Sequence, residues 1–227
     1  MEYLLPALMA VLIGAVHFFG EEIDEFTGDY NFFLVSFSAG LTIAYFFAIL
    51  IPETSRHSVF GVDNLSILAG LSIFYIIEEA IYKRDQNFGE IKYNFKEIHT
   101  VFVGLYYAAV GTVMVFLFET SSMQQLLLFF IPVLIHTAVN SLAMKEMHEE
   151  MLENKFIQII ISLSTLAGVI LGSLLDIPIS FLYTLLGVLG GSFIYIVIHD
   201  ALDPRKERPV GFITGVLLFL ILTFIII

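Results

Sequence analysis

Long apolar runs separated by short polar segments dominate the sequence. A window of about 19 residues divides the chain into eight such runs, each near the length a helix needs to cross a hydrocarbon core of about 30 Å. The shorter alternating segments of a membrane β-barrel are missing. We therefore predict an all-α membrane protein with eight transmembrane helices in a single domain, residues 1–227. The runs cover residues 3–19, 32–51, 65–82, 99–118, 126–144, 156–175, 179–199 and 210–227.

The Lys and Arg residues between these runs indicate the orientation. With eight spans the connections alternate sides, and nine of the ten basic residues fall on one side, leaving only Arg56 on the other. The positive-inside rule places the basic side in the cytoplasm. Both termini are then expected to face outward, and the longest loop, about residues 83–98 between the third and fourth helices, is expected to be cytoplasmic.

Composition supports the membrane assignment and narrows the chemistry. Apolar residues make up 58% of the chain, against roughly 45–50% in ordinary soluble domains. The net charge of −12 argues against nucleic-acid binding and favours attraction to cations. Cysteine is absent, so a bound metal would need His, Asn, Asp, Glu or hydroxyl ligands. The first apolar run lacks the basic residues that begin a secretory signal.

A polar strip, His-Thr-Ala-Val-Asn-Ser at residues 136–141, interrupts the fifth run. Ionisable groups at the centre of a membrane are costly unless they meet partners or water, and they often mark a substrate path. His136 and Asn140 are four residues apart and share one helix face. Two interpretations of His136 stay open. It is either a ligand on a transport path or a neutral side chain that bonds to Tyr106 or Tyr107 and fixes the fifth helix against the fourth.

A weak internal symmetry relates the second and seventh runs. The second contains Gly40-x4-Tyr45 and continues to Pro52-Glu53, and the seventh contains Gly190-x4-Tyr195 and continues to Asp203-Pro204. These helices should point in opposite directions, as an inverted repeat of helices 1–3 and 6–8 requires. Such a repeat predicts a 3+2+3 arrangement with helices 4 and 5 in the middle. The alternative is plain helix packing at small residues, as expected for Gly168-x3-Gly172.

This outline is similar to that of the ZIP metal-ion transporters, over most of the chain. The shared features are eight spans, outward termini, the longest loop between helices 3 and 4, Ser38-Ala39-Gly40 leading to Pro52-Glu53, and Gly190-Gly191-x3-Tyr195 leading to Asp200 and Pro204. The resemblance implies the 3+2+3 helix arrangement. It also implies uptake of zinc, iron or related divalent cations into the cytoplasm.

The resemblance further implies a metal site on helices 4 and 5, and here the sequence departs from the family. Tyr106 to Gly111 keeps only the glycine of the helix 4 motif, with no carboxylate. In helix 5 only His136 matches, and Asn140 stands where a second histidine is expected. A pair of divalent ions needs several anionic oxygens in a medium of low dielectric. The usual binuclear site is therefore not expected.

Further metal-ligating side chains lie toward the ends of the spans. His17 and Glu21 are four residues apart, so one helix face offers both to a single cation. Glu146 and Glu150 are spaced in the same way, and for that run a solvated, charged helix end is the alternative. Glu53, Glu119 and Asp176 fall on the predicted outer side and are expected to attract cations. The full set of candidate metal ligands is His136, Asn140, Glu78, Glu79, His199, Asp200, His17, Glu21 and Glu53.

The sequence thus predicts a ZIP-like transporter of divalent cations, zinc, iron or similar, with a reduced central site. The alternative is a transporter-derived membrane protein that has lost metal transport and binds another ligand or a partner protein. No enzyme is expected, since Gly-x-Ser-x-Gly, His-Glu-x-x-His and phosphate-binding glycine motifs are missing. No cofactor is predicted beyond a bound divalent metal ion. The expected surroundings are the lipid bilayer of the cell membrane, and small-residue faces are compatible with a homodimer.

Overall fold

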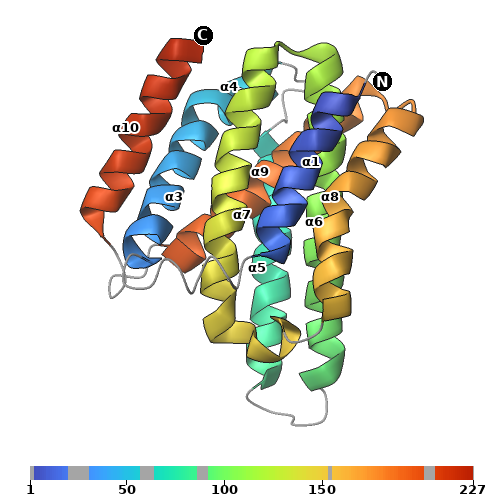
Figure 1. Cartoon of the computed structure of the whole chain (residues 1–227), viewed down its shortest axis with the longest axis vertical. Coiled ribbons are helices and arrows are strands. Elements are labelled where there is room, and N and C mark those ends of the chain that lie inside the picture. Colours follow the sequence, from blue (N-terminus) through green and yellow to red (C-terminus); the bar gives the residue numbers. More distant parts are fainter. Residues whose placement is uncertain are drawn as a thin grey trace.

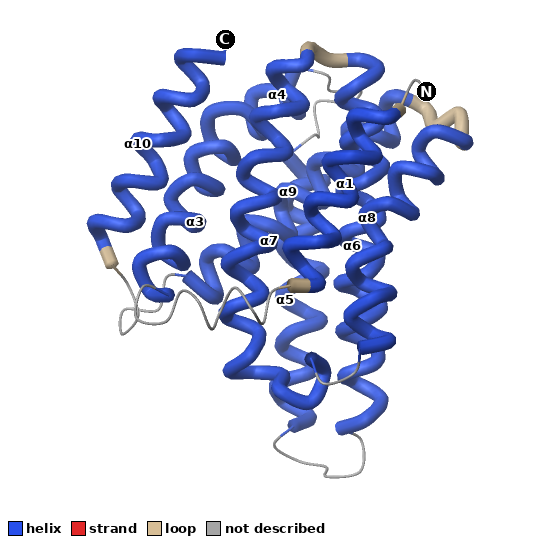
Figure 2. Tube along the Cα trace, viewed as in Figure 1, coloured by secondary structure: helices blue, strands red, loops and turns tan. Residues whose placement is uncertain are grey.

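The computed structural model describes residues 3–19, 31–56, 64–85, 92–152, 155–201 and 208–226, which form helices joined by short connections (Figure 1). No strand occurs in these ranges (Figure 2). Taking α3, η2 and α4 as one rod, the described residues form eight rods, so the predicted all-α class and helix number are confirmed. The elements are α1 Leu4–Phe18, α3 Asn31–Tyr45, η2 Phe46–Leu50, α4 Ile51–Arg56, α5 Asn64–Asp85, α6 Lys92–Thr120, α7 Met123–Leu152, α8 Lys155–Leu174, α9 Ile179–Ala201 and α10 Pro209–Ile226.

Several rods have the length and apolar character of membrane spans. Within the described residues, five are long and apolar enough to cross a membrane, and the apolar parts of α1, α5 and α7 are shorter. Large apolar side chains also face outward, such as Leu174, 76% exposed, and Phe224, 92% exposed. Contiguous apolar surface of this kind is rare on soluble monomers. These are the features of a membrane protein. The five spans are Phe32–Ser55, Val101–Thr120, Lys155–Leu174, Ile179–Ile198 and Pro209–Ile226.

Successive rods run in opposite directions, and the N- and C-terminal ends lie at the same end of the bundle (Figure 1). Three rods continue beyond their apolar runs. α5 ends at Asp85 and α6 begins at Lys92, so helix occupies both ends of the segment predicted as the longest loop. α7 likewise continues to Leu152. Lys, Arg and Glu are good helix formers, so these helices extend where the apolar pattern has ended.

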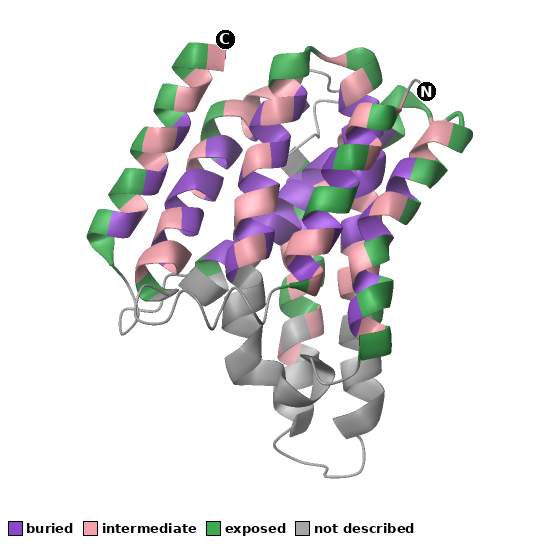
Figure 3. Ribbon diagram, in the orientation of Figure 1, coloured by how far each residue is buried: buried purple, intermediate pink, exposed green. Residues whose placement is uncertain are grey.

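The helices pack as two groups with α7 between them. The first group is α1, α6 and α8, in which α8 packs along both of the others. The second group is the α3 rod, α5, α9 and α10, in which α3 packs along α10 and α5 packs along α9. α7 contacts α3 on one side and α1 and α6 on the other. Buried positions accordingly gather on the helices in the middle of the molecule, while the described buried residues of α10 are Gly211, Gly215 and Phe219 (Figure 3).

Glycines hold each group together through backbone contact. A Cβ atom on Gly111 of α6 would overlap the carbonyl oxygen of Thr165 on α8, and one on Gly168 would overlap that of Ala108. In the second group, a Cβ on Gly40 of α3 would overlap the carbonyl oxygen of Phe212 on α10. Small residues of this kind let helix backbones approach closely. The packing interpretation of Gly40 and Gly168 is therefore confirmed.

Large rings make the contacts between the groups and with α7. The ring of Phe116 on α6 lies 5.0 Å from that of Tyr183 on α9, measured between centroids. Tyr106 of α6 lies 6.5 Å from Phe193 of α9. Within each group, helix backbones thus meet at glycines. Between the groups, side-chain rings make the contacts.

Candidate functional site

The polar strip of α7 lies in the buried middle of the bundle. Thr137 is 1% exposed, and its hydroxyl donates to the Val133 carbonyl at 2.8 Å. The Tyr107 hydroxyl of α6 donates to the Thr137 hydroxyl oxygen at 3.4 Å. A tyrosine therefore links α6 to α7 at this level, and its bond reaches Thr137, the residue after His136. The predicted bond from His136 itself to Tyr106 or Tyr107 stays a prediction.

His136 packs against the second helix group. Its side chain is 9% exposed. The imidazole meets the Phe193 ring of α9 edge to face, with centroids 4.4 Å apart and planes at 87°. The Tyr106 ring approaches the same Phe193. His136 consequently lies at the junction of α7 with both helix groups.

His17 of α1 reaches the same centre. Its side chain is 8% exposed, and its ring lies 5.3 Å from that of Tyr107 in an edge-to-face contact. Its Nδ1 has no hydrogen-bond partner among the described residues. Glu21, the predicted partner of His17, lies outside the described residues. The structure instead brings His17 to Tyr107, whose hydroxyl donates to Thr137, the residue that follows His136.

Two hydroxyl groups on α3 were missed by sequence analysis. Ser38 and Thr42 are 1% and 0% exposed, and neither Oγ atom has a hydrogen-bond partner in the described part of the chain. Buried polar atoms are normally paired. A pair of hydroxyl residues four apart inside an apolar run was a usable signal, because such residues share one helix face.

The other candidate ligands are not brought together among the described residues. The backbones of Glu78, Asn140, His199 and Asp200 lie in α5, α7 and α9, but their side chains are outside the described part. Glu79 is half-buried on α5, and Glu53 is half-buried on α4, at the far end of the α3 rod. Among the side chains that the structure describes, no three His, Asp or Glu residues form a group able to hold a metal ion.

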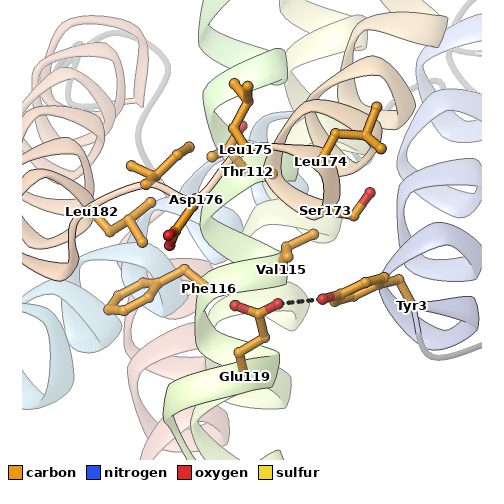
Figure 4. Close-up of a pocket in the computed structure, with 12 residues that line it drawn as sticks. Tyr3, Thr112, Val115, Phe116, Glu119, Ser173, Leu174, Leu175, Asp176 and Leu182 are labelled. Atoms are coloured by element: carbon orange, nitrogen blue, oxygen red, sulfur yellow. Dashed lines mark hydrogen bonds between the residues drawn. The ribbon is translucent and has the colours of Figure 1, made fainter.

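An acidic hollow opens at the end of the bundle that carries the chain termini. It has a volume of about 300 Å³ and is lined by Tyr3, just before α1, and by residues of α6, α8, α9 and the α8–α9 connection. Glu119 and Asp176 reach it from two different segments, and the Tyr3 hydroxyl donates to Glu119 (Figure 4). Two exposed carboxylates give this hollow a negative charge that attracts cations.

Fold and centre together define a helical membrane protein with a buried core of imidazole and hydroxyl groups. No protein-family model matches the chain. No curated protein is significantly similar to it either.

Proposed function

We propose that this protein is a ZIP-like transporter that moves divalent metal cations, such as zinc or iron, across a membrane. The observation that carries the proposal is the buried imidazole of His136, placed where α7 meets both helix groups. Intramembrane ionisable residues typically mark ion pathways. Imidazole is also a preferred ligand of zinc, iron and related ions.

Alternating access is the mechanism that this packing favours. It requires two rigid bodies that move against each other around a central site. Backbone contacts at glycines such as Gly111 and Gly40 join the helices within each group. Between the groups, the contacts among the described residues include ring pairs such as Phe116 with Tyr183. The site at His136 lies on this surface between the groups.

The helix pairing also supports the ZIP-like 3+2+3 arrangement. In this arrangement a two-fold axis exchanges helices 1–3 with helices 6–8. The α3 rod (helix 2) then exchanges with α9 (helix 7), and α5 (helix 3) exchanges with α10 (helix 8). The axis therefore turns the α3–α10 pair into the α9–α5 pair, and both are extensive contacts. α6 and α7 remain as the central two helices. With the basic connections in the cytoplasm, the acidic hollow at Glu119 and Asp176 opens outward and collects cations.

Donor chemistry sets the kind of ion site that this proposal requires. His136 supplies one imidazole, Asn140 is one turn away on the same helix, and His17 brings a second imidazole to Tyr107. A site of neutral donors compensates the lost hydration of a divalent ion only in part. We therefore propose a weak site in which the ion keeps some of its water, which suits a transporter that must release its cargo.

The alternative function is a transporter-derived protein that no longer moves metal. Tyr107, at a ligand position of the ZIP helix 4 motif, is used in packing and bonds to Thr137. The missing carboxylates at this level favour that alternative. It would leave the fold intact and replace cation transport with binding of another ligand or a partner protein.

Uptake into liposomes separates the two functions. We expect the purified protein, reconstituted with a metal-sensitive dye inside, to give saturable uptake of at least one ion among Zn²⁺, Fe²⁺, Mn²⁺ and Co²⁺. Protein-free liposomes are the first control. The second is competition, in which another of these four ions is added outside the liposomes. Uptake no faster than in protein-free liposomes for all four ions, from protein that is folded, would support the alternative.

A further inference from the structure

Ser38 and Thr42 on α3 are buried hydroxyls with unusual surroundings. Serine and threonine hydroxyls inside a helix usually donate to the carbonyl four residues earlier, as Thr54 does to Leu50 at 2.9 Å. Ser38 and Thr42 make no hydrogen bond among the described residues, although both are almost completely buried. An unpaired buried hydroxyl destabilises a fold relative to an apolar group of the same shape.

Both hydroxyls lie on the face of α3 that meets α7. Ser38, Thr42 and Tyr45 follow one another at intervals of four and three residues and therefore share a helix face. The Tyr45 ring on this face lies 6.1 Å from Phe129 of α7 and 6.0 Å from Phe219 of α10, measured between centroids. The backbone of α3 meets α10 on another face, at Gly40. α3 and α7 also pack against each other.

The register of the two helices then places Ser38 level with His136. α3 and α7 run in opposite directions (Figure 1). Ser38 precedes Tyr45 by seven residues, and His136 follows Phe129 by seven residues. Seven residues are about two helical turns, or roughly 10.5 Å, on each helix. Because the helices are antiparallel, moving two turns back from Tyr45 to Ser38 on α3 matches moving two turns forward from Phe129 to His136 on α7.

The same count places Thr42 level with Pro132, three residues from the aromatic contact on each helix. Pro132 is buried inside α7 and has no N–H to offer the carbonyl of Leu128. On the α7 side, this stretch thus includes a turn in which the Leu128 carbonyl receives no hydrogen bond from position 132. The imidazole of His136 lies one turn beyond it.

We propose that Ser38 and Thr42 form the second half of the central cation site, facing His136 across the α3–α7 contact. This inference rests on the proposed transport function. The occupant is a divalent cation that keeps part of its hydration shell, with bound waters donating to the hydroxyl oxygens. Imidazole favours zinc-like ions and neutral oxygen favours manganese-like ions. The two halves therefore set the selectivity of the site in opposite directions.

The test removes the hydroxyls and keeps the side-chain shape. The double variant Ser38→Ala, Thr42→Val is reconstituted in liposomes, and initial uptake of Mn²⁺ and Zn²⁺ is measured together with the Tm in detergent. We expect the Tm to stay the same or rise, because the lost groups are unpaired. Mn²⁺ uptake should fall at least about tenfold, and Zn²⁺ uptake should fall less, following the donor preferences.

Ser36→Ala is the matched control on the same helix. The Ser36 hydroxyl is buried but accepts a hydrogen bond from the Arg208 backbone N–H at 2.9 Å. This variant should lower the Tm and leave the Mn²⁺ to Zn²⁺ uptake ratio unchanged. The double variant should thus change the Mn²⁺ to Zn²⁺ uptake ratio without lowering the Tm. The control should lower the Tm without changing that ratio.

Each other outcome has a defined meaning. If the wild type takes up metal and the double variant matches it for both ions, the two hydroxyls are not part of the site, and the transport function stands. A lowered Tm in the double variant would show that the hydroxyls are paired in the fold, which also overturns the inference. If folded wild-type protein takes up neither ion, nor Fe²⁺ or Co²⁺, the transport function is wrong and the inference falls with it.

Discussion

Gly111→Ala is expected to destabilise the protein by about 2 kcal/mol, while the same substitution at Gly104 is neutral or stabilising by up to about 1 kcal/mol. Both glycines lie on α6, seven residues apart, and face α8. A Cβ on Gly111 would overlap the backbone carbonyl of Thr165, which cannot move without shifting α8. A Cβ on Gly104 would lie 3.4 Å from the Ser164 hydroxyl, an ordinary contact.

Chemical or thermal unfolding in detergent measures this difference. The free energy of unfolding should fall only for the Gly111 variant, and alanine should gain helix propensity over glycine at position 104. Equal effects at the two positions would contradict the close packing of α6 on α8. The comparison needs no knowledge of the substrate, so it tests the helix arrangement on its own.

His136→Ala is expected to reduce metal uptake by roughly 100-fold. Loss of outer contacts to a metal ligand already costs about 10–100-fold in affinity or activity, and this change removes the imidazole itself. Thr137→Val is the matched control, because it removes the hydroxyl that Tyr107 contacts and keeps the imidazole. Uptake by this control should stay within a few-fold of the wild type, in the range expected for a weak hydrogen bond.

This pair of variants also separates the two interpretations of His136. If His136 served only to fix α7 against its neighbours, His136→Ala would lower the Tm through its lost contact with Phe193. The uptake per folded molecule would then stay unchanged. The lost contact with Phe193 lowers the Tm under either interpretation, so a loss of uptake per folded molecule is the result that a metal ligand predicts.

Much of the architecture could be predicted from the sequence, because lipid imposes a simple requirement. About 20 apolar residues are needed for each span, and each of the eight predicted runs corresponds to a helical rod. Helix ends were less predictable, since α6 and α7 continue through charged residues that hydropathy counts as loop. Helix pairing was not predictable, because contacts such as Gly111 with Thr165 join residues far apart in the chain.

The candidate site was predictable only where a residue type is rare in an apolar run. His136 was found because an imidazole is exceptional there, whereas the Tyr107 hydroxyl bonds to Thr137, which was not predicted. Ser38 and Thr42 were missed because hydroxyls are common in membrane helices, where a bond to the preceding turn usually satisfies them. Only the structure shows that these two lack such a bond. His17 was assigned to a helix end, and its contact with Tyr107 required knowledge of how α1 packs.

Locating a bound metal is the most direct test of a cation site at the centre. Crystals grown with Zn²⁺ alone, measured on both sides of the zinc absorption edge, should give an anomalous peak beside His136, between α7 and α3. A peak confined to the acidic hollow at Glu119 and Asp176, or no peak near His136 at saturating Zn²⁺, would contradict the central site and with it the proposed path through the bundle.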